Sequence, residues 1–195
     1  LLDGSIKPVG IPDANGNSIM APYSALGNDE IKKFYQTGTI LQNNLNISAG
    51  GAEGYVNLNL GNVRRDFILE GDELNRNTVV LTAGKKINKF TVGGTFTFTN
   101  QRTKQANVNA ATSRSDYTLL TTLLQAASNI PITEFKDRGL YGWNGYYQNP
   151  YWARENNRLE ETKNFVNLGM NAGYEINKNI ELVYNGSVQM RNTNQ

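Results

Sequence analysis

The chain has 195 residues, of which 38% are hydrophobic, 10% aromatic and only 18% charged, and its formal net charge is +2. It has no Cys and no His, which excludes a disulfide framework, thiolate metal sites, most zinc chemistry and His-based catalytic triads. The near-neutral charge argues against a nucleic-acid groove, and no apolar run is long enough for a membrane-spanning helix.

The amide content favours extended structure. There are 28 Asn beside 19 Gly, 10 Tyr and 7 Phe, and Asn and Gly prefer turns to helices. The charged fraction is below the ~25% of an average soluble domain. We therefore expect a β-rich protein whose polar surface is amide and hydroxyl. Because the chain starts at Leu1 and stops shortly after a strand-like run, we expect a fragment of a larger protein.

Residues 1–42 are rich in Gly, Pro, Asn and Ser and show no sustained period. This composition predicts a loop segment, which we expect to be extracellular, with a short turn of helix starting near Asn28.

From residue 43 the hydrophobic period changes to two, as where Phe96 and Phe98 alternate with Thr95 and Thr97. Alternate side chains of a strand point to opposite faces, so each run predicts a strand with one apolar and one polar face. Strands are expected near residues 43–49, 55–61, 76–87, 90–100, 165–176 and 180–192.

The connections alternate in length. Three are short and Gly- or Asn-rich, as expected for hairpin turns, whereas the loop at 101–163 is far longer than the ~15 residues usual in compact domains. Short turns at one end and long loops at the other are typical of a transmembrane β-barrel, whose strands of about ten residues, tilted ~45°, span ~25 Å. We predict that residues 43–195 form a partial antiparallel barrel wall of about six strands.

A soluble antiparallel sandwich also alternates apolar and polar residues. Its exposed face would carry many Lys and Glu, whereas the polar faces here are Asn, Thr, Gly and Ser. Six strands at ~4.8 Å spacing also leave an open sheet about 29 Å wide with two bare edges, so the pattern favours the barrel. In a barrel the polar faces look into the lumen, and the expected lumen-facing residues are Thr91, Thr95, Thr97, Asn167, Asn171 and Asn185.

The long loop contains a predicted helix. Residues 113–116 resemble a capping box, a stripe of Leu follows from Leu119 to Leu124, and Pro131 stops the helix. This helix is expected to pack the loop onto the barrel rim or a plug.

Six aromatic residues crowd into positions 141–152 of the same loop. They predict either a contact surface for a ligand or partner, because aromatic rings stack on sugars and anchor protein interfaces, or the core of the loop itself. These residues are Tyr141, Trp143, Tyr146, Tyr147, Tyr151 and Trp152.

Catalytic patterns are weak. Glu160 and Glu161 are adjacent and point to opposite sides of an extended chain, and residues 50–54 lack the spacing of a phosphate loop. No nucleophile and base can be paired, so the sequence predicts a protein that is not an enzyme and has neither cofactor nor metal.

Several motifs, in this order and spacing, resemble the barrel of SusC/RagA-type TonB-dependent transporters of Bacteroidota. The resemblance covers about residues 28–192 and is carried by residues 34–38 (FYQTG), 44–51 (NLNISAGG), 76–79 (RNTV), 86–90 (KINKF) and 149–152 (NPYW). It implies a 22-stranded barrel with a plugged lumen in the outer membrane of a Gram-negative bacterium, of which this chain is a part.

The same resemblance implies import of oligosaccharides or peptides, a SusD-like lipoprotein as lid, and energy from TonB through parts outside this chain. Membrane lipid is a further partner, and nucleic acid is not. Two alternatives stay open: a soluble carbohydrate-binding β-sandwich that uses residues 141–152, and a passive porin.

Overall fold

The computed structural model describes residues 3–27, 29–106, 119–139, 143 and 148–195. The chain divides into two compact units. Unit 1 consists of Leu1–Thr39, Asp66–Asp72 and Lys104–Leu159, and unit 2 of Ile40–Arg65, Glu73–Thr103 and Glu160–Gln195.

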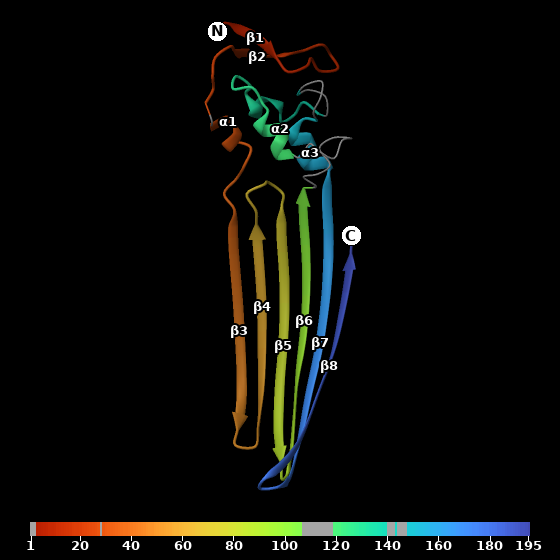
Figure 1. Cartoon of the computed structure of the whole chain (residues 1–195). Coiled ribbons are helices and arrows are strands. Elements are labelled where there is room, and N and C mark those ends of the chain that lie inside the picture. Colours follow the sequence, from red (N-terminus) through yellow and green to blue (C-terminus); the bar gives the residue numbers. More distant parts are fainter. Residues whose placement is uncertain (1–2, 28, 107–118, 140–142, 144–147) are drawn as a thin grey trace. The chain divides into compact units, whose positions relative to one another are not determined.

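Unit 2 is built from six long strands that follow one another across a single antiparallel sheet (Figure 1). Their order in the sheet is their order in the chain, and the sheet is open, with the first and last of them at its edges. The predictions of a β-rich chain and of six antiparallel strands are confirmed. The strands are β3 (Thr39–Gly51), β4 (Gly54–Asp66), β5 (Glu73–Ile87), β6 (Phe90–Ala106), β7 (Arg158–Asn177) and β8 (Ile180–Asn194).

The strands are longer than the alternating pattern indicates. β7 begins at Arg158 rather than near 165, and β6 continues to Ala106 instead of ending near 100. The added residues are mostly polar, so they lack alternation, yet they pair with the neighbouring strand, as Thr162 pairs with Asn194. Backbone pairing therefore extends past the apolar residues that reveal a strand in the sequence.

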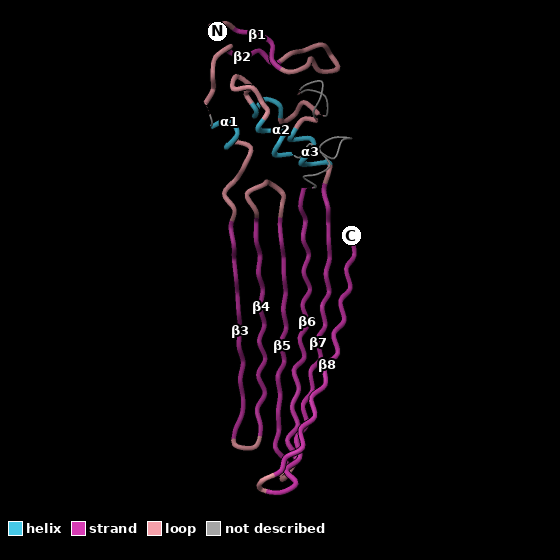
Figure 2. The backbone as a smooth tube through the Cα atoms, in the orientation of Figure 1, coloured by secondary structure: helices cyan, strands magenta, loops and turns pink. Residues whose placement is uncertain are grey.

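Unit 1 contains a second, two-stranded sheet within residues 1–42, for which only a loop was expected (Figure 2). β1 (Ile6–Val9) pairs antiparallel with β2 (Ile19–Pro22). The connecting turn is closed by Asp13, whose carboxylate accepts hydrogen bonds from two backbone N–H groups, each at 2.9 Å. The loop prediction is wrong here because four-residue strands are too short to show a period.

The helices are short. They are α1 (Asp29–Lys32), α2 (Leu119–Leu124), the 3-10 helix η1 (Ile132–Phe135) and α3 (Pro150–Asn156). None of the helices in the described parts of the chain is both long and apolar enough to cross a membrane.

Helix α2 confirms a helix after residue 118, although residues 113–116, the expected capping box, lie outside the described residues. Leu119 and Leu123 are buried, whereas Leu120 and Leu124 are 53% and 63% exposed. Two of the four leucines of the predicted stripe are therefore buried in unit 1 and two are exposed, because residues four apart, such as Leu119 and Leu123, share one side of a helix.

The buried hydrophobic core of the described residues belongs entirely to unit 1. Its largest fully buried side chains include Phe34, Leu123, Ile132 and Phe135. Of the six strands, only β6 contributes to this core, through its last residue Ala106, which belongs to unit 1, so the sheet of unit 2 has no buried core on either face.

Candidate functional site

The register of β7 and β8 sorts side chains by polarity. Leu168 pairs with Val188 and Tyr174 with Leu182, whereas Asn171 pairs with Asn185. Because pairs alternate between the two sides of a sheet, apolar pairs occupy one side and polar pairs the other. We call these sides the apolar face and the polar face.

The polar face carries hydrogen bonds between neutral side chains of neighbouring strands. Thr82 and Thr95 lie 3.4 Å apart between their hydroxyl oxygens, and the hydroxyl of Ser48 donates to Asn57 at 3.2 Å. Asn167, also on this face, has a buried Oδ1 with no hydrogen-bond partner among the described residues. The six residues predicted to face a lumen are Thr91, Thr95, Thr97, Asn167, Asn171 and Asn185, and the strand alternation places all of them on this face.

Charge on the polar face gathers at the two ends of the strands: Glu161 and Lys163 form an ion pair at the end away from the short turns, whereas Lys86, Glu175 and Glu181 lie beside the turns. Lys86 Nζ lies 2.6 Å from Glu175 Oε1, and an added Cβ at Gly173 would lie 2.9 Å from Glu181 Oε1. The missing side chain at Gly173 therefore leaves room for the carboxylate of Glu181 to lie over β7.

The apolar face of unit 2 is uncovered in this chain. Met170, Leu182 and Val188 are 62%, 65% and 60% exposed. Single exposed apolar residues are ordinary in soluble proteins, but a contiguous apolar patch of this extent marks an interaction surface.

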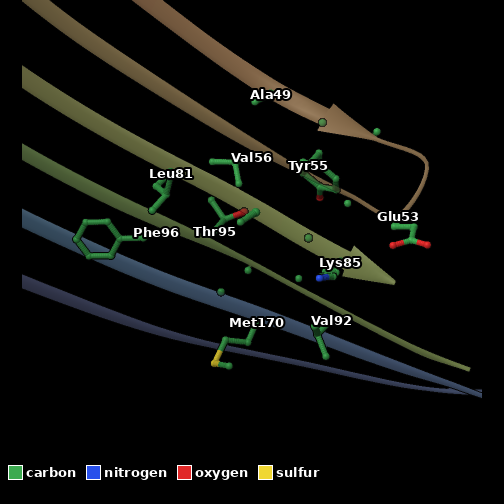
Figure 3. Close-up of a pocket in the computed structure, with 18 of the residues that line it drawn as sticks. Ala49, Glu53, Tyr55, Val56, Leu81, Lys85, Val92, Thr95, Phe96 and Met170 are labelled. Atoms are coloured by element: carbon green, nitrogen blue, oxygen red, sulfur yellow. The ribbon is translucent and has the colours of Figure 1, made fainter. Parts of the chain in front are cut away.

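An open hollow of about 990 Å³ lies on this face (Figure 3). Small residues, including Ala83 and Gly94, alternate with the larger Leu81, Phe96 and Met170 along its lining. Lys85 is the one basic residue among those that line it, and Glu53, in the turn after β3, is the one acidic residue.

Aromatic rings and a row of asparagines bound the apolar face. Next to the short turns, the rings of Phe90 and Tyr174 lie 4.6 Å apart between centroids. Toward the other end of the strands, Asn62 Nδ2 donates to Asn77 Oδ1 at 2.7 Å.

The asparagine row continues across the sheet. Asn100 Nδ2 donates to Asn164 Oδ1 at 2.7 Å, and Asn164 pairs in register with Asn192. With Asn62 and Asn77, one asparagine therefore stands on each strand from β4 to β8. This row was not predicted from the sequence, although its pattern is present there: in each of these strands an Asn is the first polar residue where the apolar alternation stops.

The loop aromatics that the structure describes lie in or beside the core of unit 1. Trp143 is buried and packs edge-on against Phe135 at 5.0 Å, and Tyr151 is buried against Phe34 at 4.9 Å. Trp152 is half-buried. These contacts agree with the interpretation that the rings form the core of the loop. Three further residues of the predicted contact surface lie outside the described residues: Tyr141, Tyr146 and Tyr147.

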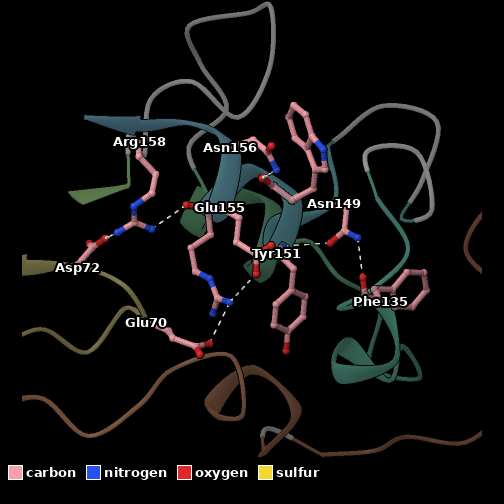
Figure 4. Close-up of polar contacts among 10 residues, drawn as sticks. Glu70, Asp72, Phe135, Asn149, Tyr151, Glu155, Asn156 and Arg158 are labelled. Atoms are coloured by element: carbon pink, nitrogen blue, oxygen red, sulfur yellow. Dashed lines mark hydrogen bonds and ion pairs between the residues drawn. The ribbon is translucent and has the colours of Figure 1, made fainter. Parts of the chain in front are cut away.

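The segment at 149–152 has a structural role that its composition explains (Figure 4). Asn149 caps α3 by accepting a hydrogen bond from the N–H of Tyr151 at 3.0 Å, and its amide donates to the carbonyl of Phe135 at 2.7 Å. Pro150 occupies the first helical position, where its missing N–H costs nothing.

Two arginines anchor residues 70–72 within unit 1 (Figure 4). Arg154 belongs to α3, and Arg158 is the first residue of β7. Arg154, only 3% exposed, lies 2.9 Å from Glu70, and Arg158 lies 2.7 Å from Asp72. Each guanidinium has an acidic partner, so the pair holds the chain together rather than presenting free positive charge.

No group of three or more acidic residues able to hold a metal ion occurs among the described residues. No known protein family matches the chain, and no curated protein matches it either. The geometry of the sheet therefore carries the functional argument.

Proposed function

We propose that unit 2 is part of the wall of a transmembrane β-barrel whose apolar face meets lipid and whose polar face lines the lumen. The observation that carries this proposal is the sorting of cross-strand pairs: long strands hold apolar residues on one uncovered side and amides and hydroxyls on the other. A soluble sheet would cover its apolar side with protein.

The height of the apolar face supports a membrane-spanning role. On β7 this face runs from Tyr174, beside the short turn, to Asn164 in the asparagine row. Ten residues at ~3.3 Å each, tilted by about 40–45°, rise ~24 Å, close to the ~25 Å apolar band of outer-membrane barrels. In the proposal, the rings of Phe90 and Tyr174 lie at one membrane–water interface and the asparagine row lies at the other.

The stagger of the turns gives an independent estimate of tilt. The asparagine row lies about nine residues from the turn on β4, about eleven on β5 and β6, and about fourteen on β7. In the proposal, the three short turns lie at one membrane surface. Between the turn before β4 and the turn after β7, the distance from turn to asparagine row grows by ~15 Å along the strands, while the sheet extends ~19 Å across them. This ratio corresponds to a strand tilt of about 40°. Transmembrane barrels have tilts of ~35–45°.

We further propose that the barrel belongs to a SusC/RagA-type TonB-dependent transporter in the outer membrane of a Gram-negative bacterium, as the motif resemblance implies. Its function would be import of an oligosaccharide or peptide with a SusD-like lipoprotein, with energy delivered by TonB. The polar face suits this function, because neutral amides and hydroxyls hydrogen-bond such solutes without trapping ions.

Two adjacent residues of β8 test the orientation in the intact protein. Val188 pairs with Leu168 on the apolar face, whereas Ser187 lies on the polar face opposite Gly169, where a long side chain has room. Val188→Arg puts a charge into lipid near the middle of the band, at a cost of ~2–4 kcal/mol, and should reduce the heat-modifiable protein recovered from outer membranes. Ser187→Arg should assemble normally.

Normal assembly of Val188→Arg would contradict the proposal, and recovery of the unaltered protein from the soluble fraction would favour the β-sandwich. Transport is tested separately with labelled oligosaccharides and peptides. Uptake that stops when the proton-motive force is collapsed supports TonB dependence, whereas uptake that continues indicates a passive porin.

A further inference from the structure

The hollow on the apolar face has the chemistry of an amphiphile site. Its lining is apolar along the strands, with Leu81, Phe96 and Met170 on the side away from the turn after β3. Its charged residues, Lys85 and Glu53, lie on the turn side (Figure 3). One open depression therefore offers an apolar trough that ends beside one cation, Lys85, and one carboxylate, Glu53.

Lys85 is a basic residue on the apolar face of the sheet, where an anionic group could pair with it. The lysine follows Ala83 on the apolar side of β5, and a Cβ at Gly54 would lie 3.5 Å from its own Cβ, which places the two residues side by side. It is exposed and forms no ion pair with any residue that the structure describes. By contrast, the next residue, Lys86, is on the polar face and is held by Glu175 at 2.6 Å.

The small residues of the trough explain its depth. Ala49 on β3, Ala83 on β5 and Gly94 on β6 all line it, and an added Cβ at Gly94 would lie 3.2 Å from the carbonyl oxygen of Gly169. Leu81 and Phe96 are larger and lie two residues further from the turn between β5 and β6, so the small residues form a trough that runs across the strands. An extended hydrocarbon chain fills such a depression, since it buries apolar surface without needing hydrogen bonds.

We propose that this hollow binds one anionic phospholipid, with an acyl chain in the trough and the phosphate beside Lys85. The inference rests on the proposed membrane orientation. Lys85 lies three residues from the turn between β5 and β6, at the level where a basic side chain extends along apolar surface to reach a headgroup. The occupant is a lipid of the membrane leaflet on the short-turn side.

The test measures lipid retained by the intact protein. The protein is purified in detergent, exchanged into micelles that contain equal amounts of phosphatidylglycerol and phosphatidylcholine with the same acyl chains, and examined by native mass spectrometry. We expect the unaltered protein to retain phosphatidylglycerol in preference, and Lys85→Ala to lower that preference about fivefold.

Three variants complete the test. Lys86→Ala is the matched control, because it removes the same charge from the opposite face, and it should leave lipid retention unchanged. Lys85→Arg should keep the preference for phosphatidylglycerol. Ala83→Phe, which fills the trough but keeps Lys85, should reduce retention of both lipids.

Equal retention of phosphatidylglycerol by Lys85→Ala and the unaltered protein would overturn the proposal, as would equal losses in Lys85→Ala and Lys86→Ala. Failure of the membrane orientation itself gives a different result: the unaltered protein would not fractionate with membranes, and none of the variants would retain either lipid.

Discussion

The side-chain amide of Asn171 on β7 occupies the space that a side chain at Gly93 on β6 would need. An added Cβ at Gly93 would lie 2.5 Å from Oδ1 of Asn171, closer than real contacts allow. The two residues fit together as a large and a small partner on the polar face. The same relation recurs between Tyr55 and Gly84, where the distance to the ring would be 2.7 Å.

Gly93→Val should therefore destabilise the sheet by about 1–3 kcal/mol, because the branched side chain displaces the amide of Asn171. The midpoint temperature of the heat-induced mobility shift of the intact protein measures this effect. Adding Asn171→Gly should restore much of the loss. A double variant no more stable than Gly93→Val would show that the two residues do not compete for space.

Asn149→Ala should destabilise α3 by about 2 kcal/mol, since one side chain both caps the helix and bonds the carbonyl of Phe135 within a fully buried site. Hydrogen–deuterium exchange of the backbone of residues 151–156 should become faster. Asn156→Ala serves as the control, because Asn156 is exposed and, among the described residues, its amide donates only to the carbonyl of Trp152. Equal acceleration in both variants would contradict the role of Asn149.

Burial raises the pKa of Tyr151 above its ordinary value of 10.0, and Glu70 and Glu30 act in the same direction, while Arg154 opposes them. The folded state therefore keeps its phenolic proton at a pH where the unfolded state has released it. The stability gained by burying this phenol is fully present below pH 10.0 and is lost as the pH rises above it.

Tyrosinate absorbance tests the raised pKa of Tyr151. The measured quantity is the absorbance of the unaltered protein minus that of Tyr151→Phe at each pH. The difference should appear only above pH 10.0 in the folded protein, and at the ordinary pKa in denaturant. A difference that titrates at the same pH in both conditions would show that Tyr151 is accessible to solvent in the folded state.

The alternation of apolar and polar residues suffices to predict the six-stranded sheet, because a period of two leaves a clear pattern over ten residues. It does not predict the strand ends, where polar residues such as Thr162 and Asn194 pair without alternation. Nor does it reveal β1 and β2, whose few residues are held by Asp13 and by the burial of Val9 and Ile19.

The same alternation predicts which residues form the polar face, but it does not distinguish Lys85 from its neighbours. In the sequence, Lys85 and Lys86 only interrupt a strand pattern. Separating them requires the sheet, which places one beside Gly54 and Ala83 and the other against Glu175. Likewise, the burial of Trp143 and Tyr151 depends on contacts with Phe135 and Phe34, which are distant or unpatterned in the chain.

A labelling scan along β7 tests the orientation of the sheet most directly. The chain has no Cys, so single cysteines at positions 164–174 of the intact protein, with any cysteine outside this chain replaced by Ser, can each carry a nitroxide. In lipid bilayers, labels at 166, 168, 170 and 172 should be accessible to oxygen dissolved in the lipid, and labels at 167, 169, 171 and 173 to a water-soluble relaxation reagent. Labels at 166, 168 and 170 that are shielded from both reagents would place this face inside a protein core and contradict the account.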